Sequence, residues 1–99
     1  MFLLDTNLVS ELRRPQRTNP QVAAWADSVQ PSDLFLSSIT ILELVTGALR
    51  LTRRDQRQGW LIQQWIEEQV LPAFAERILA VDTAVARRCA ALHVPDPKP

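Results

Sequence analysis

Two carboxylates, Asp5 and Glu43, occupy positions from which acidic side chains could bind one metal ion together. Asp5 directly follows the apolar run of residues 2–4, and Glu43 lies in the first turn of a predicted helix that follows a second apolar run. In an open parallel sheet, the residues that follow the strands gather at the carboxyl edge, where ligands bind. Oxygen-only ligands suit Mg²⁺ or Mn²⁺, which can activate water to hydrolyse a phosphodiester.

Each carboxylate also has a structural explanation. Asp5 can cap a short helix through Leu12, because aspartate is a favoured N-cap residue. Thr40 and Glu43 match a capping box, in which the two side chains satisfy each other's backbone donors at the start of a helix. Asp82 follows a third apolar run and suits a helix cap better than a third metal ligand. Spacing alone leaves the metal role and the capping role of Asp5 and Glu43 open.

Gly47 lies one turn beyond Glu43 in the same predicted helix. Glycine in a helix interior costs about 1 kcal/mol relative to alanine. Gly47 would leave open space beside the Glu43 carboxylate, and close packing against a neighbouring helix explains it equally well.

Other common catalytic arrangements have little support. His93 is the only histidine and lies near a predicted helix end, so a nucleophile activated by histidine is not indicated. Cys89 is the only cysteine, which excludes an internal disulfide, and its mostly apolar neighbours do not indicate an activated thiolate. The chain has only Gly47 and Gly59, so it holds no glycine-rich phosphate loop.

The composition is that of a single folded domain. The chain has 99 residues, 46% hydrophobic and 22% charged, which is too apolar for a disordered segment. The apolar start reaches Asp5 too soon for a signal peptide, and no later run could span a bilayer. With its single cysteine, the sequence predicts a soluble protein of the reducing cytoplasm.

Arginine provides most of the basic charge. The formal net charge is zero, so any contact with nucleic acid must be local rather than spread over the chain. Arginine can fork onto phosphate oxygens, and the alternative is that these side chains face solvent or complement the carboxyl ends of helices. The clusters are Arg13, Arg14 and Arg17; Arg50, Arg53, Arg54 and Arg57; and Arg87 and Arg88.

Three short apolar runs alternate with segments of helical period, which predicts an α/β fold with a parallel sheet. Predicted strands cover residues 2–4, 34–36 and 78–81. Asn19 as N-cap and Pro20 as first helical residue predict a helix over 20–29. The remaining predicted helices are 40–51, 54–71 with an end near Pro72, and a helix from Asp82 that ends before Pro95.

The predicted helix over 54–71 has an apolar face broader than one stripe. This face could lie in the domain's own core, or part of it could meet a partner chain. It consists of Trp60, Leu61, Ile62, Trp65 and Ile66.

Two blocks of sequence resemble PIN-domain toxins of the VapC type. Residues 3–13, Leu-Leu-Asp-Thr-Asn-Leu-Val-Ser-Glu-Leu-Arg, are similar to the family's opening. Residues 38–47, Ser-Ile-Thr-Ile-Leu-Glu-Leu-Val-Thr-Gly, are similar to its next signature, in which a metal-binding glutamate precedes a glycine by four residues. Residues 78–82 and the helix after them are more loosely similar to the family's third strand and following helix.

The resemblance implies a three-layer α/β/α fold and an endoribonuclease that depends on Mg²⁺ or Mn²⁺. Asp5 and Glu43 would be the metal ligands. The implied partners are an RNA substrate, a cognate VapB-type antitoxin and a second copy of the chain. Residues implied to support the site or the RNA are Thr6, Asn7, Ser10, Glu11 and Thr40.

In the family, further metal-binding acidic residues come from a later helix and the strand end after it. Residues 1–99 are therefore expected to form a single PIN domain that lacks its last helix and strands and has impaired activity. Asp96, within the proline-rich end, is no better a third ligand than Asp82. The alternative function is a non-catalytic module that dimerises or binds an antitoxin through its apolar helices, with Asp5 and Glu43 acting only as caps.

Overall fold

Three short strands form a parallel sheet with the second strand in the middle. A computed structural model describes residues 1–14 and 18–92. In it, β1 (Phe2–Leu3), β2 (Leu34–Ser37) and β3 (Ile78–Leu79) lie in the order β1-β2-β3. The predicted parallel sheet is confirmed, although β3 ends two residues earlier than residue 81.

Strand β2 pairs on both of its sides. Phe2 lies opposite Leu34, and Leu36 lies opposite Ile78. The apolar runs are continuous rather than alternating because helices cover such sheets and bury both faces of the strands. Leu36 is fully buried, as its central position requires.

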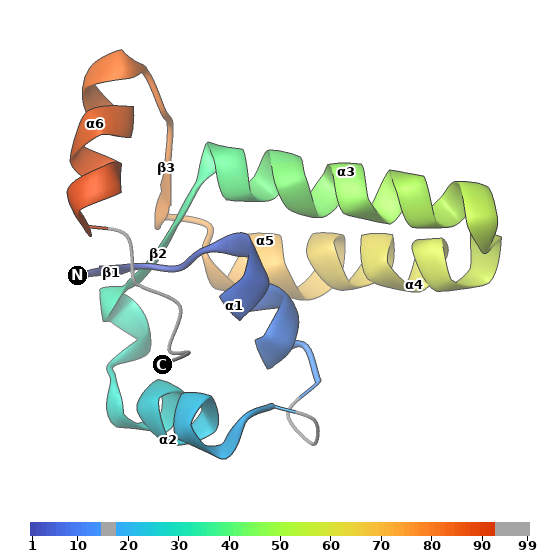
Figure 1. Cartoon of the computed structure of the whole chain (residues 1–99), viewed down its shortest axis with the longest axis horizontal. Helices are drawn as coiled ribbons and strands as arrows, with labels where there is room; N and C mark the ends of the chain where they lie inside the picture. The colour runs from blue at the N-terminus through green and yellow to red at the C-terminus, as the bar shows by residue number, and fades with distance from the viewer. Residues whose placement is uncertain (15–17, 93–99) are drawn as a thin grey trace.

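Helices flank the sheet on opposite sides (Figure 1). Helices α3 and α4 form an antiparallel hairpin that extends from one side, while α6 lies on the other. No helix within the described residues combines the length and apolar character that crossing a bilayer requires. The helices are α1 (Thr6–Leu12), α2 (Pro20–Ser28), α3 (Ser38–Arg54), α4 (Gln56–Trp65), α5 (Leu71–Ala73) and α6 (Thr83–Leu92), with a 3-10 turn at Pro31–Asp33 and a π-helical turn at Ile66–Val70.

Helix α2 begins as predicted. The Asn19 side chain accepts a hydrogen bond from the Gln21 amide at 2.8 Å, and Pro20 is the first helical residue. The helix packs against the edge of the sheet, where the Trp25 ring meets the Phe2 ring edge to face at a centroid distance of 5.5 Å.

Helical structure runs through Pro72 and ends at Ala73, close to the predicted end. Five residues of π-helix follow α4, and Pro72 then lies in the short helix α5. The backbone at Val70 and Leu71 is helical, so the run is continuous and Pro72 lies in its last turn, directly after the π-helical turn. The predicted end near Pro72 is therefore confirmed to within one residue, although Pro72 itself is helical.

The broad apolar face of residues 60–66 is divided between core and surface. Ile66 is only 2% exposed and belongs to the hydrophobic core with Leu4, Leu36 and Val70. Trp60, by contrast, is 57% exposed. The domain's own core therefore accounts for Ile66 but not for Trp60, and contact of the exposed part with a partner chain stays a prediction.

The α3–α4 hairpin depends on a close helix crossing at Gly59. A β-carbon built on Gly59 would lie 2.5 Å from the Cα of Thr52, which is closer than real side chains approach. The Thr52 hydroxyl donates to the Ala48 carbonyl at 2.8 Å and accepts from the Gln63 amide group at 3.0 Å. Gly59 is thus required for helix packing.

Substitution of the two glycines should have opposite effects on stability. Gly59→Ala should lower the free energy of unfolding by about 1–3 kcal/mol, because the new methyl group forces the hairpin apart. The matched change Gly47→Ala meets nothing within 4 Å and should raise that free energy by up to about 1 kcal/mol. Urea denaturation measures both, and equal effects would contradict the assigned crossing.

Candidate functional site

Asp5 lies at the end of β1 and caps α1. Its Oδ1 atom accepts a hydrogen bond from the Leu8 amide at 2.7 Å. The amide of Leu4 donates to the Phe35 carbonyl at 2.9 Å, which fixes the backbone just before Asp5 against β2. The predicted cap is therefore confirmed, and it also sets the position of the carboxylate at the edge of the sheet.

Glu43 does not take part in a capping box. Helix α3 begins at Ser38 rather than Thr40, because the Ser37 side chain caps it by accepting from the Thr40 amide at 3.2 Å. Glu43 consequently lies in the second turn, and its carboxylate is not needed by the backbone of the helix start. The capping box predicted for Thr40 and Glu43 was wrong.

The Glu43 carboxylate instead meets the start of α1. The Thr6 hydroxyl donates to Glu43 Oε1 at 2.7 Å, and Thr6 is the residue directly after Asp5. This contact brings the two candidate ligands to one junction between α1 and α3. Glu43 is exposed there, so its carboxylate is accessible to a ligand.

The start of α3 is held in place by short polar side chains. Thr40 is 2% exposed, and its hydroxyl lies 3.4 Å from that of Ser37. The Ser38 hydroxyl accepts from the Val81 amide at 3.2 Å, which ties the segment after β3 to the first residue of α3. Thr40 therefore supports the helix that carries Glu43.

The other α1 residues predicted to support the site face different ways. Asn7 and Ser10 are exposed. Glu11 turns toward α2, since its Oε1 atom accepts from the Asn19 amide at 2.9 Å. Its backbone carbonyl also accepts from the Thr18 hydroxyl at 2.9 Å, so Glu11 links α1 to α2 rather than to Glu43.

Asp82 caps α6 as predicted. Its Oδ1 atom accepts from the Val85 amide at 2.8 Å. The structure thus gives Asp82 the role expected of a strand-end aspartate before a helix. His93 and Asp96 lie outside the described residues.

A groove of about 430 Å³ opens beside Glu43, between α1 and the hairpin. Gly47 lies on its wall, and a β-carbon added there would meet nothing within 4 Å. Gly47 therefore leaves open space beside the carboxylate, and the alternative of close helix packing is wrong. The groove is lined by Thr6, Ser10, Arg13, Arg14, Glu43, Leu44, Gly47, Ala48, Ile62 and Trp65.

An arginine stacked on a tryptophan forms one wall of this groove. The guanidinium carbon of Arg13 lies 5.9 Å from the centre of the Trp65 ring, a cation–π distance. Burial lowers the pKa of Arg13 from its ordinary value, and the adjacent charge of Arg14 lowers it further. The sequence did not indicate this pairing, because Trp65 was grouped with the apolar face of α4.

The donor atoms at the junction suit a hard divalent cation. Asp5 and Glu43 supply carboxylate oxygens, the ligands that Mg²⁺ and Mn²⁺ prefer. Over residues 1–14 and 18–92, no group of three or more His, Cys, Asp or Glu side chains is placed to hold a metal ion. Asp5 and Glu43 are therefore two candidate ligands without a third within the described residues.

Comparison with known proteins decides the family. The model of the PIN domain matches residues 2–96 of the chain. The chain belongs to the PIN-domain family. It is 43% identical over 86 residues to toxin FitB of Neisseria gonorrhoeae and 44% identical over 73 residues to ribonuclease VapC14 of Mycobacterium tuberculosis. These alignments cover 87% and 74% of this PIN chain.

The same fold is found in a solved structure. The PIN chain superposes on the crystal structure of FitAcB from Neisseria gonorrhoeae with a TM-score of 0.75 and 41% identity, over 92% of its residues. The PIN-like α/β fold predicted from the sequence is thus confirmed. The chain spans 60% of the length of FitB, 70% of VapC14 and 63% of the FitAcB chain.

Two substitutions distinguish the capping role of the Asp5 side chain from the effect of its charge. Asp5→Ala should lower the free energy of unfolding by about 1 kcal/mol, because the Leu8 amide loses its partner. Asp5→Asn should leave stability almost unchanged, since asparagine caps helices about as well as aspartate. Urea denaturation of both variants measures this, and a loss in Asp5→Asn as large as in Asp5→Ala would refute the cap.

Proposed function

We propose that Asp5 and Glu43 bind Mg²⁺ or Mn²⁺ and that the protein is a metal-dependent endoribonuclease toxin. The contact between Thr6 and Glu43 is the observation that carries this proposal, because it joins the elements of both carboxylates at 2.7 Å. When bound, the ion would activate water and neutralise charge on the leaving oxygen of a phosphodiester. The names of VapC14 and FitB, a ribonuclease and a toxin, support the same activity.

The residues of the chain would fix the two ligands before the ion binds. The Leu8 amide restrains the Asp5 carboxylate, and the Thr6 hydroxyl orients the carboxylate of Glu43. Ligands held in this way lose less conformational freedom on binding, so preorganisation favours the bound state. Thr6 is a positioning residue in this account.

The pair of carboxylates also sets how strongly the ion is held. Mg²⁺ keeps several of its waters and is usually bound through one or two carboxylates together with substrate phosphates. The RNA itself would therefore complete the site, and the affinity for metal without RNA would be weak. We propose accordingly that residues 1–99 alone cleave RNA slowly.

A protein of this class would be neutralised by an antitoxin. We propose a VapB-type antitoxin as the partner, on the basis of the resemblance to VapC-type toxins. Exposed apolar side chains on the hairpin, Trp60 and Leu61 among them, offer surface for such a contact.

Removal of either ligand should abolish the cleavage of RNA. Asp5→Asn and Glu43→Gln each remove one charge while keeping the hydrogen bond to Leu8 or Thr6, so we expect at least a hundredfold loss of Mg²⁺-dependent cleavage of single-stranded RNA. Cleavage is measured with labelled RNA with and without EDTA. Matched controls are Asp27→Asn and Glu67→Gln, which are exposed carboxylates on other helices.

Undiminished cleavage by either ligand variant would overturn the assignment of that ligand. Cleavage that persists in EDTA would overturn the metal dependence itself.

A second candidate function, a module that self-associates without catalysis, is favoured by the exposure of Trp60. This side chain is 57% exposed, and Leu61 beside it is 41% exposed. On this account the chain dimerises at micromolar concentration, and Trp60→Ala with Leu61→Ala returns it to the monomer. Sedimentation velocity over a concentration series measures this, and a monomer throughout would exclude self-association.

A further inference from the structure

Four residues of α3 form a row that leads away from the proposed metal site. Glu43, Gly47, Arg50 and Arg54 are spaced i, i+4, i+7 and i+11, which places them along one side of the helix. All four are exposed. At about 1.5 Å per residue, Arg50 and Arg54 lie about 10 Å and about 16 Å from Glu43 along the helix axis.

A second pair of arginines faces the beginning of this row. Arg13 and Arg14, which directly follow α1, line the groove that also contains Glu43 and Gly47. Arg13 is held over Trp65 by its cation–π contact, so its planar guanidinium has a defined orientation. The groove thus has cationic groups on the α1 side and, beyond Gly47, on the α3 side.

We propose that this row is a track for the backbone of single-stranded RNA. The strand would have its cleaved phosphate at Glu43, pass over the open surface at Gly47, and place its next phosphates at Arg50 and Arg54. Arg13 and Arg14 would hold the strand from the opposite side. The proposal rests on the proposed nuclease function, because it names the path of the substrate away from that site.

The shape and charge of the row favour RNA over an acidic protein segment. Arginine forks onto phosphate oxygens, and a guanidinium held on an aromatic ring can also stack against a nucleobase. Gly47 lets a bulky backbone come close to the helix. At the Glu43 end, a substrate phosphate could complete the proposed cation site, because Mg²⁺ is usually bound through one or two carboxylates together with substrate phosphates.

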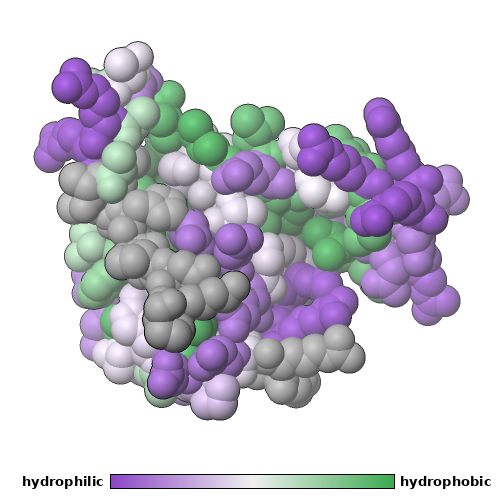
Figure 2. Space-filling view, in the orientation of Figure 1, coloured by the Kyte–Doolittle hydropathy of each residue, from purple (hydrophilic) through white to green (hydrophobic). Residues whose placement is uncertain are grey.

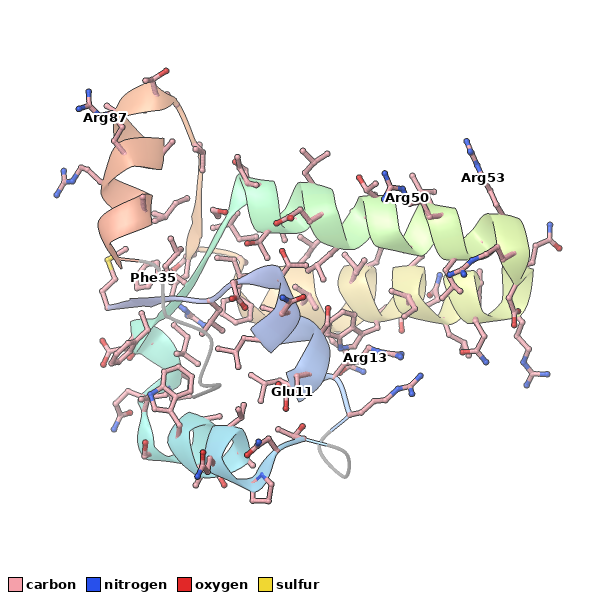
Figure 3. All side chains as sticks on the ribbon, viewed as in Figure 1. Glu11, Arg13, Phe35, Arg50, Arg53 and Arg87 are labelled. Atoms are coloured by element: carbon pink, nitrogen blue, oxygen red, sulfur yellow. The ribbon has the colours of Figure 1, made fainter. Side chains whose placement is uncertain are left out.

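Hydrophilic residues gather at one end of the hairpin. Hydrophilic side chains cluster at the tip of the α3–α4 hairpin, while the end of α3 nearer the sheet is more apolar on this side of the molecule (Figure 2). Arg50 projects from α3, and Arg13 lies beside α4 (Figure 3). Residues 50–57 hold four arginines and one aspartate in a chain whose formal net charge is zero. Basic charge is therefore concentrated near the tip of the hairpin, toward which the proposed path runs.

Binding without cleavage tests this track directly. The 99-residue chain is titrated into a fluorescently labelled single-stranded RNA in EDTA, and anisotropy reports the Kd at several salt concentrations. Arg50→Gln with Arg54→Gln should raise the Kd about tenfold and reduce the slope of log K against log salt by about 1 to 2. Arg13→Gln should weaken binding severalfold, and Arg13→Lys should restore only part of it because lysine lacks the planar fork.

The matched control is Arg87→Gln with Arg88→Gln, which removes the same charge from exposed positions on α6. We expect less than a twofold change in the Kd. Equal loss in this control and in the Arg50 and Arg54 variant would overturn the track, because it would mean that only net charge matters. Wild-type affinity in the Arg50 and Arg54 variant would overturn it as well. So would displacement of the labelled RNA by polyglutamate that is as effective as displacement by unlabelled RNA of the same charge.

The result does not depend on catalysis. Asp5→Asn and Glu43→Gln should still bind RNA in EDTA, since neither removes an arginine. RNA binding that requires Arg50 and Arg54, without metal-dependent cleavage, would support the track and refute the nuclease. Cleavage and binding that are both unaffected by loss of these arginines would support the nuclease and refute the track.

Discussion

The hydrogen bond from the Thr6 hydroxyl to the Glu43 carboxylate is the contact on which the proposed site depends. It joins α1 and α3, the helices that follow the neighbouring parallel strands β1 and β2, and it lies next to Asp5 in the sequence. Without it, Asp5 would be a cap at the start of α1 and Glu43 an exposed carboxylate on α3. With it, the two acidic side chains belong to one junction that opens into a groove.

The same residues therefore serve folding and the proposed chemistry. The Asp5 carboxylate caps α1 through one oxygen, and this bond also restrains the group that would bind metal. Glu43, in contrast, has no role at the start of its own helix, because Ser37 caps α3. The two glycines also have different roles: Gly59 permits the helix crossing, and Gly47 leaves space beside the site.

The sequence was sufficient to predict the features that depend on contacts between residues close together in the chain. The apolar runs predicted the three strands correctly. Asn19, Asp5 and Asp82 cap their helices, as their positions indicated. The start of α3 was misplaced because Ser37 and Thr40 are both good caps and Glu43 has capping-box spacing from Thr40. Glu43 instead accepts a hydrogen bond from Thr6, a residue 37 positions away in sequence that capping rules do not consider. Likewise, the roles of Gly47 and Gly59 depend on which helix lies opposite each.

Direct measurement of metal binding tests the central claim, that Asp5 and Glu43 form one divalent-cation site. Mn²⁺ is titrated with the 99-residue chain, and the electron paramagnetic resonance signal of the free ion reports how much is bound. Weak binding to the wild-type chain, lost in both Asp5→Asn and Glu43→Gln while both variants stay folded, is the predicted result. Equal binding by the wild type and either variant, or none by the wild type even with RNA present, would contradict it.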